Sequence, residues 1–245
     1  MKKIAMIPAR YMATRFPYKL MQQLGDKTVI RHTYDNVIAT NLFDDVMVIT
    51  DSVIIYNEIV NNNGKAIMSV NEHESGSDRI AEAVVNIEAD IVLNVQGDEP
   101  FIDKNTLQIL LAAFENPSVE VASVMKIFTD ASLVDNINYV KVVVDNNMNS
   151  LLFSRSVIPY LRDQTIRPTY YEHIGVYAFR KKTLLQFTQW KPTPLELAEK
   201  IECLRYLENG VPLKMVLTEH AGVKIDVPED LEKAKAYLHN YLLKY

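Results

Sequence analysis

The sequence predicts an α/β fold, in which a Rossmann-like, mostly parallel β-sheet is flanked by helices. Apolar runs typical of strands alternate with helix-like segments through the first half of the chain. The runs 3–8, 45–50 and 89–95 show no polar alternation, as expected of strands covered on both faces. A chain of 245 residues with 48% hydrophobic content suits a single domain spanning 1–245.

The elements of the first half follow from hydrophobic periodicity and from the residues that end each run. Pro8 is expected to stop the first strand, and the Asn-rich stretch before Gly64 is expected to end the second helix. The order is strand 3–8, helix 28–40, strand 45–50, helix 52–63, strand 65–70, helix 77–87 and strand 89–95. Repeated units of this kind place a ligand site at the carboxyl ends of the strands.

The second half begins in the same way and then changes character. The expected elements are helix 103–115, strand 119–128, a hairpin of 140–145 with 150–153, strand 171–180, helix 194–209, strand 213–218 and helix 231–245. The turn-rich DNNMN join indicates antiparallel pairing within the hairpin. We therefore expect an insertion at about 138–190 that makes the sheet mixed.

Composition excludes several classes of function. A net charge of −5 argues against a nucleic-acid binder, which needs a basic face. The single Cys203 excludes an intramolecular disulfide framework and favours a cytoplasmic protein. No apolar run reaches the roughly 18 to 20 residues of a membrane span, so no membrane partner is expected. All seven glycines are isolated, which excludes the G-x-G-x-x-G turn and the P-loop.

Arg10, Arg15 and Lys19 follow the first strand within ten residues. Three cations in a loop at the carboxyl end of a strand suit a polyphosphate. A solvated basic loop is the alternative.

Two acidic positions and one turn also lie where ligand contacts are expected. Asp98 follows the buried strand 89–95 and could hold Mg²⁺ against phosphates, or only cap a turn. Asp226 could be a second metal ligand, or only the N-cap of the last helix. We expect both to end strands at one edge of the sheet and to converge on one ion. In the loop 71–79, Ser75 and Gly76 could serve only as turn and helix cap.

The amino-acid sequence of these segments resembles that of the CMP-Kdo synthetase (3-deoxy-manno-octulosonate cytidylyltransferase) family. The resemblance covers essentially the whole chain, and it is carried by PARYMATRFPYK, HESGSDR, VQGDEP, PTPLELAEKIECLR and KIDVPEDL. It implies a fold of the nucleotide-diphospho-sugar transferase type. It also implies that Arg10, Arg15 and Lys19 hold the triphosphate of CTP. The remaining nucleotide contacts that it implies are Ser75, Gly76, Arg79 and Gln96.

For catalysis, the resemblance implies Mg²⁺ held by Asp98 and Asp226, with Arg10 and Lys19 completing the catalytic set. Near the residues of this catalytic set the chain departs from the family pattern at four positions, where Ala13, Tyr18, Leu20 and Lys224 replace Ser, Gly, Pro and Gly. The reaction class is expected to survive these changes, because the three cations and both carboxylates are retained.

For the acceptor sugar, the resemblance implies Arg15, His173, Tyr177, Glu202 and Cys203. His173 and Tyr177 share a strand face, where a packed core histidine is the alternative. Glu202 could instead belong to a solvated helix face with Glu196 and Glu199. Cys203 departs from an expected glutamine. The sugar carboxylate could meet Arg155 or Arg162, and the sequence leaves that choice open.

The expected reaction is CTP plus Kdo giving CMP-Kdo and pyrophosphate for lipopolysaccharide biosynthesis, by a homodimer whose contact lies in 138–190. Two alternatives stay open. One is a sister cytidylyltransferase for 8-amino-Kdo or sialic acid, and the other is an inactive nucleotide-binding module.

Overall fold

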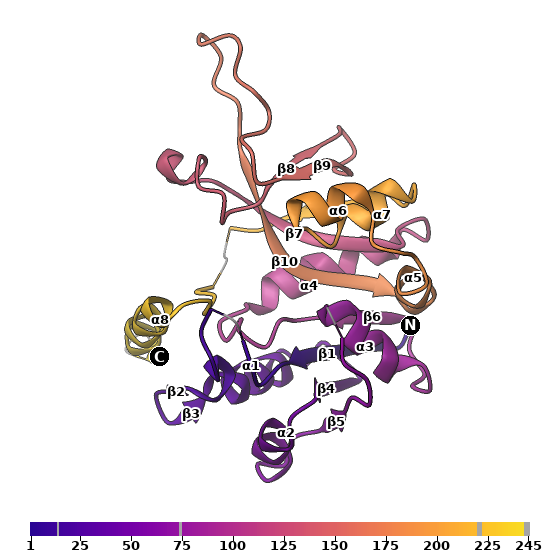
Figure 1. Cartoon of the computed structure of the whole chain (residues 1–245), viewed down its shortest axis with the longest axis vertical. Coiled ribbons are helices and arrows are strands. Elements are labelled where there is room, and N and C mark those ends of the chain that lie inside the picture. The colour runs from indigo at the N-terminus through magenta and orange to yellow at the C-terminus, as the bar shows by residue number, and fades with distance from the viewer. Residues whose placement is uncertain (14, 74, 220–221, 243–245) are drawn as a thin grey trace. The chain divides into compact units, whose positions relative to one another are not determined.

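The computed structural model describes residues 1–242 except 14, 74, 220 and 221, with the backbone alone for 240–242. The chain forms two compact units. Unit 1 contains 1–107 and 221–245, and unit 2 contains 108–220. The ribbon in Figure 1 follows the chain through both. Among the described helices, none is long and apolar enough to cross a membrane.

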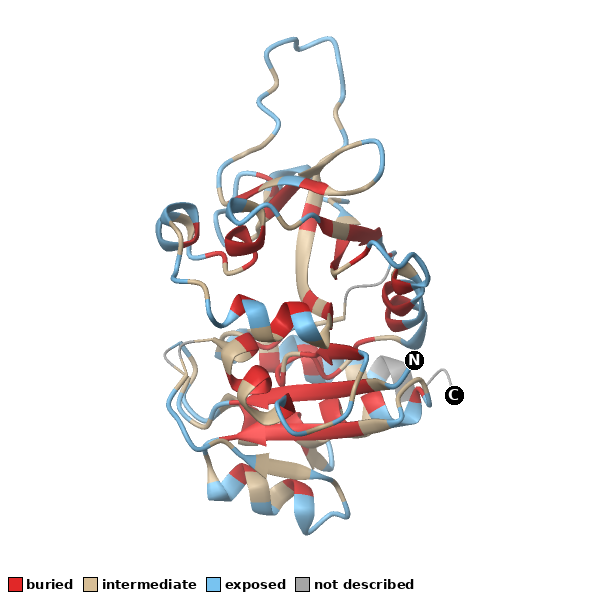
Figure 2. Ribbon diagram, turned by 90° about the vertical axis from the view of Figure 1, so that its right-hand side faces the viewer, coloured by how far each residue is buried: buried red, intermediate tan, exposed pale blue. Residues whose placement is uncertain are grey.

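Unit 1 is built on a parallel sheet in the order β6–β1–β4–β5. Its strands are β1 (Lys3–Ala9), β4 (Asp45–Thr50), β5 (Ala66–Met68) and β6 (Ile91–Asn94), with a small hairpin of β2 (Gln23–Leu24) and β3 (Lys27–Thr28). The central strands are almost wholly buried, as the red ribbons of Figure 2 show. Because the sheet strands are parallel, their carboxyl ends share one edge, and the loops that carry the predicted site leave from that edge.

The helices of unit 1 are α1 (Val29–Ala39), α2 (Val53–Val60), α3 (Gly76–Val84) and α8 (Pro228–Leu242), with a 3₁₀ turn η1 (Lys19–Met21). Helix α3 packs on β1 and β4. The Thr28, Ser52 and Ser75 side chains each accept a backbone N–H in the first turn of α1, α2 and α3. Helix α4 (Lys104–Ala112) runs across the boundary of the two units. The last residues of the predicted helix 231–245, from 243 on, lie outside the described part.

One expectation in unit 1 is wrong: Pro8 does not stop the first strand. Pro8 and Ala9 continue β1 and pair with Ile49 and Thr50 of β4. Pairing of β1 with β6 reaches only to Met6. At Pro8, β1 therefore has no paired strand, among those described, on the side of β6. A proline, which lacks an N–H, is tolerated at such an edge.

Unit 2 combines parallel and antiparallel pairing. Strand β7 (Val121–Ile127) pairs parallel with β11 (Leu213–Leu217) and antiparallel with β10 (Tyr171–Arg180). The predicted hairpin is present as β8 (Lys141–Val144) and β9 (Ser150–Ser154), and β8 also pairs with β10. The remaining elements are the 3₁₀ turns η2 (Ala113–Glu115) and η3 (Ala131–Leu133) and helices α5 (Lys181–Phe187), α6 (Pro194–Glu199) and α7 (Leu204–Glu208). The α/β prediction with a mostly parallel sheet and an antiparallel portion is confirmed.

The single helix expected over 194–209 is wrong, because α6 ends at Lys200 in the left-handed conformation with φ 54°. After this break, Arg205 donates to Glu196 Oε2 at 2.7 Å and to Oε1 at 2.5 Å. Nine residues of continuous helix would separate these side chains by about 13 Å. The buried ion pair therefore requires the break, and Glu196 does not belong to a solvated face.

Strand β10 carries an irregularity beside the predicted sugar residues. Ile174 pairs with Val124 while Tyr177 pairs with Ser123, so β10 has two more residues than β7 in this interval. The buried Ser123 hydroxyl lies 3.2 Å from the Ile174 carbonyl and 2.8 Å from that of Val176. An even number of extra residues preserves the alternation of faces, which leaves His173 and Tyr177 on the same side.

Candidate nucleotide and metal site

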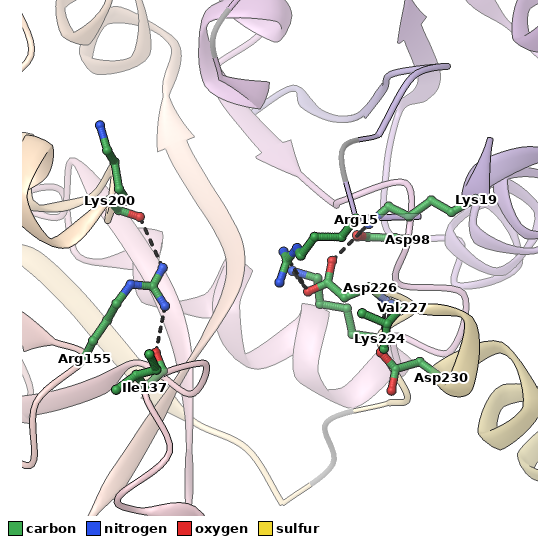
Figure 3. A network of polar contacts seen from close by, with 10 residues as sticks. All are labelled: Arg15, Lys19, Asp98, Ile137, Arg155, Lys200, Lys224, Asp226, Val227 and Asp230. Atoms are coloured by element: carbon green, nitrogen blue, oxygen red, sulfur yellow. Dashed lines mark hydrogen bonds and ion pairs between the residues drawn. The ribbon is translucent and has the colours of Figure 1, made fainter. Parts of the chain in front are cut away.

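The predicted metal ligands converge in unit 1. The Lys19 ammonium donates to Asp98 Oδ2 at 2.5 Å and to Asp226 Oδ1 at 3.0 Å, so both carboxylates contact one cation (Figure 3). Asp98 is buried after β6, and Asp226 precedes α8. Two residues separated by most of the chain therefore form one acidic pair.

The reason expected for this convergence is wrong for Asp226, which does not end a strand. The segment that leads to it, 222–225, is unpaired by any strand. It is placed by the fully buried Ile225, whose N–H donates to the Asp98 carbonyl at 3.1 Å. The hydrogen bond and the apolar anchor together bring Asp226 beside Asp98.

Cations surround Asp226 (Figure 3). Arg15 Nη2 lies 3.3 Å from Oδ2, and Lys224 Nζ lies 3.6 Å from the same oxygen. Burial alone would raise the pKa of Asp226, but Lys224, Lys19 and Arg15 hold it below its ordinary value. The Asp230 carboxylate, in the first turn of α8, accepts the N–H groups of Asp226 and Val227 at 3.2 Å and so ties the segment before the helix to its start.

The acidic pair has the character of a Mg²⁺ site. Asp98 Oδ1 is buried without a hydrogen-bond partner among the described residues, although a buried carboxylate oxygen normally has one. Mg²⁺ in phosphate-transfer sites takes one or two carboxylates and completes its shell with phosphate oxygens and water. Asp98 and Asp226 therefore fit Mg²⁺, and Lys19 is the cation that now neutralises both.

Glu99 follows Asp98 in the sequence and interacts electrostatically with both carboxylates of the pair. Its side chain is buried, and this burial raises the pKa of its carboxyl to about 8. The charges of Asp98 and Asp226 also raise the pKa, while the charges of Lys224 and Lys19 lower it. A group of this kind is neutral near pH 7 and adds no third negative charge to the pair.

The predicted nucleotide residues line one pocket of about 170 Å³ in unit 1. Its walls include Arg10, Lys19, Ser75, Gly76, Arg79, Gln96 and Asp98. Arg15 is not part of this lining and lies instead at Asp226. Residues from three loops at one sheet edge are thus brought together, as the sequence predicted.

The floor of the pocket is set by close backbone approach. A Cβ at Gly97 would lie 3.1 to 3.2 Å from Ile30, Leu20 and the Pro8 carbonyl, and a Cβ at Gly76 would lie 3.1 Å from Pro8. Both positions therefore favour glycine for reasons of space. Ser75 caps α3 by accepting from the Asp78 N–H at 3.1 Å, so the structural role expected for Ser75 is real whether or not it also meets a ligand.

The Arg79 guanidinium is already bound by other side chains of the protein. Its guanidinium donates to Ser69 Oγ and Asp51 Oδ2, both at 2.7 Å, and the residue is only 2% exposed. Arg79 and Arg10 also line a second recess of about 590 Å³. Arg79 therefore fixes the loop walls of both pockets.

The predicted sugar residues of unit 2 form their own cluster. The rings of His173 and Tyr177 lie 5.4 Å apart, and Ser123 Oγ is 3.0 Å from His173 Nε2. Burial, together with the nearby Cys203 and Glu202, raises the pKa of Tyr177, whose hydroxyl is hydrogen-bonded to the Cys203 thiol. Cys203 is 1% exposed, so its contact is with Tyr177.

Arg155, one of two arginines considered for the sugar carboxylate, binds backbone instead. Its guanidinium donates to the carbonyls of Glu199 at 2.7 Å, Ile137 at 2.8 Å and Lys200 at 3.4 Å (Figure 3). The Glu199 carboxylate in turn accepts from Ser154 Oγ and the Arg155 N–H. Arg155 and Glu199 thus join the α6 break to β9, while Arg162 is exposed.

Sequence reasoning missed two contributors. Ser123, which supports the irregular strand and contacts His173, carries no motif that would single it out. Lys224 was noted only as a departure from the family pattern, yet its ammonium faces Asp226, and the charge of Asp98 raises its pKa most. The only signal in the sequence was its position two residues before Asp226.

Comparisons with known proteins agree with this geometry. A profile of the cytidylyltransferase family matches residues 4–235. The 3-deoxy-manno-octulosonate cytidylyltransferase of Flavobacterium johnsoniae is 56% identical over 243 residues, which cover 98% of this chain and 100% of that protein. The protein of the same name from Christiangramia forsetii is 54% identical over 238 residues, 96% of each chain.

A solved structure of CMP:2-keto-3-deoxy-manno-octonic acid synthetase complexed with CTP has a TM-score of 0.94 to this fold. The two are 34% identical, and the match covers 98% of this chain and 100% of that one. Sequence, fold and the paired carboxylates lead to one assignment: the chain belongs to the cytidylyltransferase family, among the 3-deoxy-manno-octulosonate cytidylyltransferases.

Proposed function

We propose that this protein couples CTP to Kdo, giving CMP-Kdo and pyrophosphate for lipopolysaccharide biosynthesis. The observation that carries the proposal is the convergence of Asp98 and Asp226 on one ammonium beside a pocket lined by Arg10, Gly76 and Gln96. The names of the similar proteins supply the sugar.

In the proposed reaction, the anomeric hydroxyl oxygen of Kdo forms a bond to the α-phosphorus of CTP. The bond from that phosphorus to the bridging oxygen breaks, and pyrophosphate leaves. Mg²⁺ held by Asp98 and Asp226 would supply Lewis acidity, lowering the pKa of the hydroxyl and neutralising phosphate charge. Among the described residues at the acidic pair, we assign no protein base.

The cations of the opening loop stabilise the departing pyrophosphate. Lys19 is the pivotal one, because its ammonium contacts both carboxylates in the free protein. With Mg²⁺ on both carboxylates, that ammonium would be free to turn to a phosphate oxygen. Arg10 and Arg15 extend the positive charge along the loop, which lowers the energy of the developing anion.

We assign the sugar to the cluster of unit 2. His173 and Tyr177 provide hydrogen-bonding groups on one strand face, and Glu202 lies near Tyr177. Cys203 sets the position of the Tyr177 hydroxyl by its hydrogen bond. These side chains suit a polyhydroxylated acid.

We further propose a cytoplasmic homodimer. Cys203 is the one cysteine of the sequence and is buried, as suits a protein of a reducing compartment. The loop between β9 and β10 is mostly exposed, as the pale-blue excursion of Figure 2 shows, and it presents Tyr160 at 85% and Ile166 at 59% exposure. Aromatic residues of this kind are enriched at interfaces. Light scattering should show a dimer for the wild type and a weaker dimer for Tyr160→Ser.

Pyrophosphate release with CTP, Mg²⁺ and Kdo tests the reaction. The wild type should release pyrophosphate, and Asp226→Asn should lose about 100-fold or more of that rate, because one metal ligand is weakened. Asp44→Asn is the matched control, since its carboxylate accepts only the Lys3 N–H at 2.7 Å among the contacts described.

Absence of pyrophosphate release by the wild type would refute the proposal and leave the inactive nucleotide-binding module. Running the same assay with 8-amino-Kdo and with sialic acid separates the sister activities, because the proposal requires the highest kcat/KM with Kdo.

A further inference from the structure

Two side chains of helix α3 hold the loop before it. Arg79 donates to Ser69 Oγ at 2.7 Å, at the start of the loop. One turn later, the Glu82 carboxylate accepts the Val70 N–H at 2.7 Å and the Asn71 N–H at 3.4 Å, and it also pairs with His73 Nε2. Glu82 therefore fixes three residues of the loop that crosses the carboxyl end of the sheet.

The same loop carries a contact to the nucleotide pocket. The His73 carbonyl accepts from Arg10 Nη2 at 2.9 Å. Arg10 itself is exposed at the end of β1 and lines both recesses of unit 1. A long side chain in that position has many rotamers, and a fixed carbonyl acceptor reduces the number that the side chain samples.

The side chains that hold the loop are themselves shielded. The His73 side chain is 12% exposed and that of Glu82 is 21% exposed. Burial pushes the pKa of Glu82 upward, but the hydrogen bonds from Val70, His73 and Asn71 outweigh it and lower the pKa. The carboxylate is thus a charged, multiply bonded anchor on a rigid helix.

We propose that Glu82 is a positioning residue for CTP binding, acting through the His73 segment to orient the Arg10 guanidinium. Glu82 does not line either pocket, so its effect on the nucleotide is exerted through Arg10. This inference rests on the proposed function, in which Arg10 contacts the triphosphate. Preorganised cations bind a charged ligand more tightly than cations that must first be ordered.

A double-mutant cycle tests the inference, with titration calorimetry of CTP in the presence of Mg²⁺ as the readout. Glu82→Ala should weaken CTP binding by about 3- to 20-fold in the wild-type background, the range for a residue that acts through a network. In the Arg10→Ala background, the same substitution should change CTP binding by less than about twofold, because the group it positions is gone.

Two further variants separate positioning from general damage. Glu82→Gln keeps an oxygen for the Val70 N–H and should recover most of the affinity. Glu58→Ala removes a carboxylate of unit 1 that accepts from Thr28 Oγ1 at 2.9 Å, and it should leave CTP binding unchanged in both backgrounds.

The outcomes distinguish the inference from the proposal beneath it. If Glu82→Ala leaves CTP affinity unchanged, or weakens it equally in both backgrounds, Glu82 does not act through Arg10 and the inference is overturned. If Arg10→Ala itself leaves CTP affinity unchanged, the triphosphate role of Arg10 fails, and the inference fails with it. If Glu82→Ala does not fold, Glu82→Asp replaces it in the cycle under the same criterion, because its shorter side chain withdraws the carboxylate from Val70 and His73.

Discussion

At the residue scale, Lys19 neutralises the site when no ligand is bound. Its ammonium lies within 3.0 Å of one oxygen on each of two carboxylates, and its side chain is 14% exposed. Without it, Asp98 and Asp226 would repel each other in a poorly solvated position. The residue therefore stabilises the free protein, and on the proposed function the same ammonium binds a phosphate of CTP.

Lys19→Met should accordingly have two effects. CTP use should weaken by about 1 to 3 kcal/mol, the range for a charge-assisted hydrogen bond. The melting temperature without Mg²⁺ should fall, and added Mg²⁺ should restore most of it by neutralising the same carboxylates. Lys27→Met, which removes an ion pair with Asp35, is the control. A melting temperature that is insensitive to Mg²⁺ in Lys19→Met would contradict the shared role.

At the element scale, the join of α6 and α7 depends on buried polar contacts. Glu196 pairs with Arg205 and also accepts the Thr193 N–H at 3.1 Å, closing a capping box. The Arg205 guanidinium lies 4.2 Å from the Phe187 ring centre, which fixes it further. This join sets where Glu202 and Cys203 emerge, so the sugar cluster depends on it.

Glu196→Ala should destabilise the protein by about 3 to 5 kcal/mol, because it leaves a buried arginine without its carboxylate. Chemical denaturation measures the loss. Lys191→Ala, at an exposed position just ahead of α6, should change stability by less than about 0.5 kcal/mol. Equal stability of the two variants would mean that the ion pair does not hold the break.

The β7–β10 ladder gives a pH-dependent prediction. Glu172 lies opposite Lys126, and burial raises its pKa above the ordinary value of 4.5 despite the Lys126 charge. A carboxyl whose pKa is raised by folding binds more protons in the folded state than in the unfolded state. Its contribution to the free energy of unfolding is therefore fully present below about pH 4.5, and it is lost as pH rises through the folded pKa. The wild type should therefore lose stability relative to Glu172→Gln as pH rises from about 4.5 through the folded pKa of Glu172.

Thermal unfolding of both proteins across that range measures the difference in melting temperature. A difference that stays constant with pH would show that Glu172 keeps an ordinary pKa.

Local sequence patterns predicted the elements better than the contacts between them. Strands 45–50 and 171–180 occur with the expected bounds, because apolar runs and flanking turns are local signals. The break at Lys200 was not predictable, since it depends on Glu196 meeting Arg205 after the turn. Asp98 and Asp226 were predicted to converge, but the anchoring of Ile225 under Asp98 is a tertiary contact with no pattern of its own.

At the scale of the whole molecule, the residues predicted to contact the nucleotide all belong to unit 1. Hydrogen exchange should show this directly. CTP with Mg²⁺ should slow exchange most in 8–20, 69–79, 95–99 and 222–227, because ligand binding stabilises the segments that it contacts. Peptides from 171–180 should change less. Strong protection of 171–180 with none in 95–99 would contradict the assignment of the CTP pocket.

The return of segment 222–227 to Asp98 has a consequence for biosynthesis. Unit 1 joins residues 1–107 to residues beyond 220, whereas unit 2 is continuous from 108 to 220. Domains fold as they leave the ribosome, in order from the amino terminus. Unit 2, which is continuous, can fold during translation. Asp226 can reach Asp98 only after nearly the entire chain has been made. A polypeptide released early thus lacks half of its acidic pair, and on the proposed function a prematurely terminated copy cannot consume CTP.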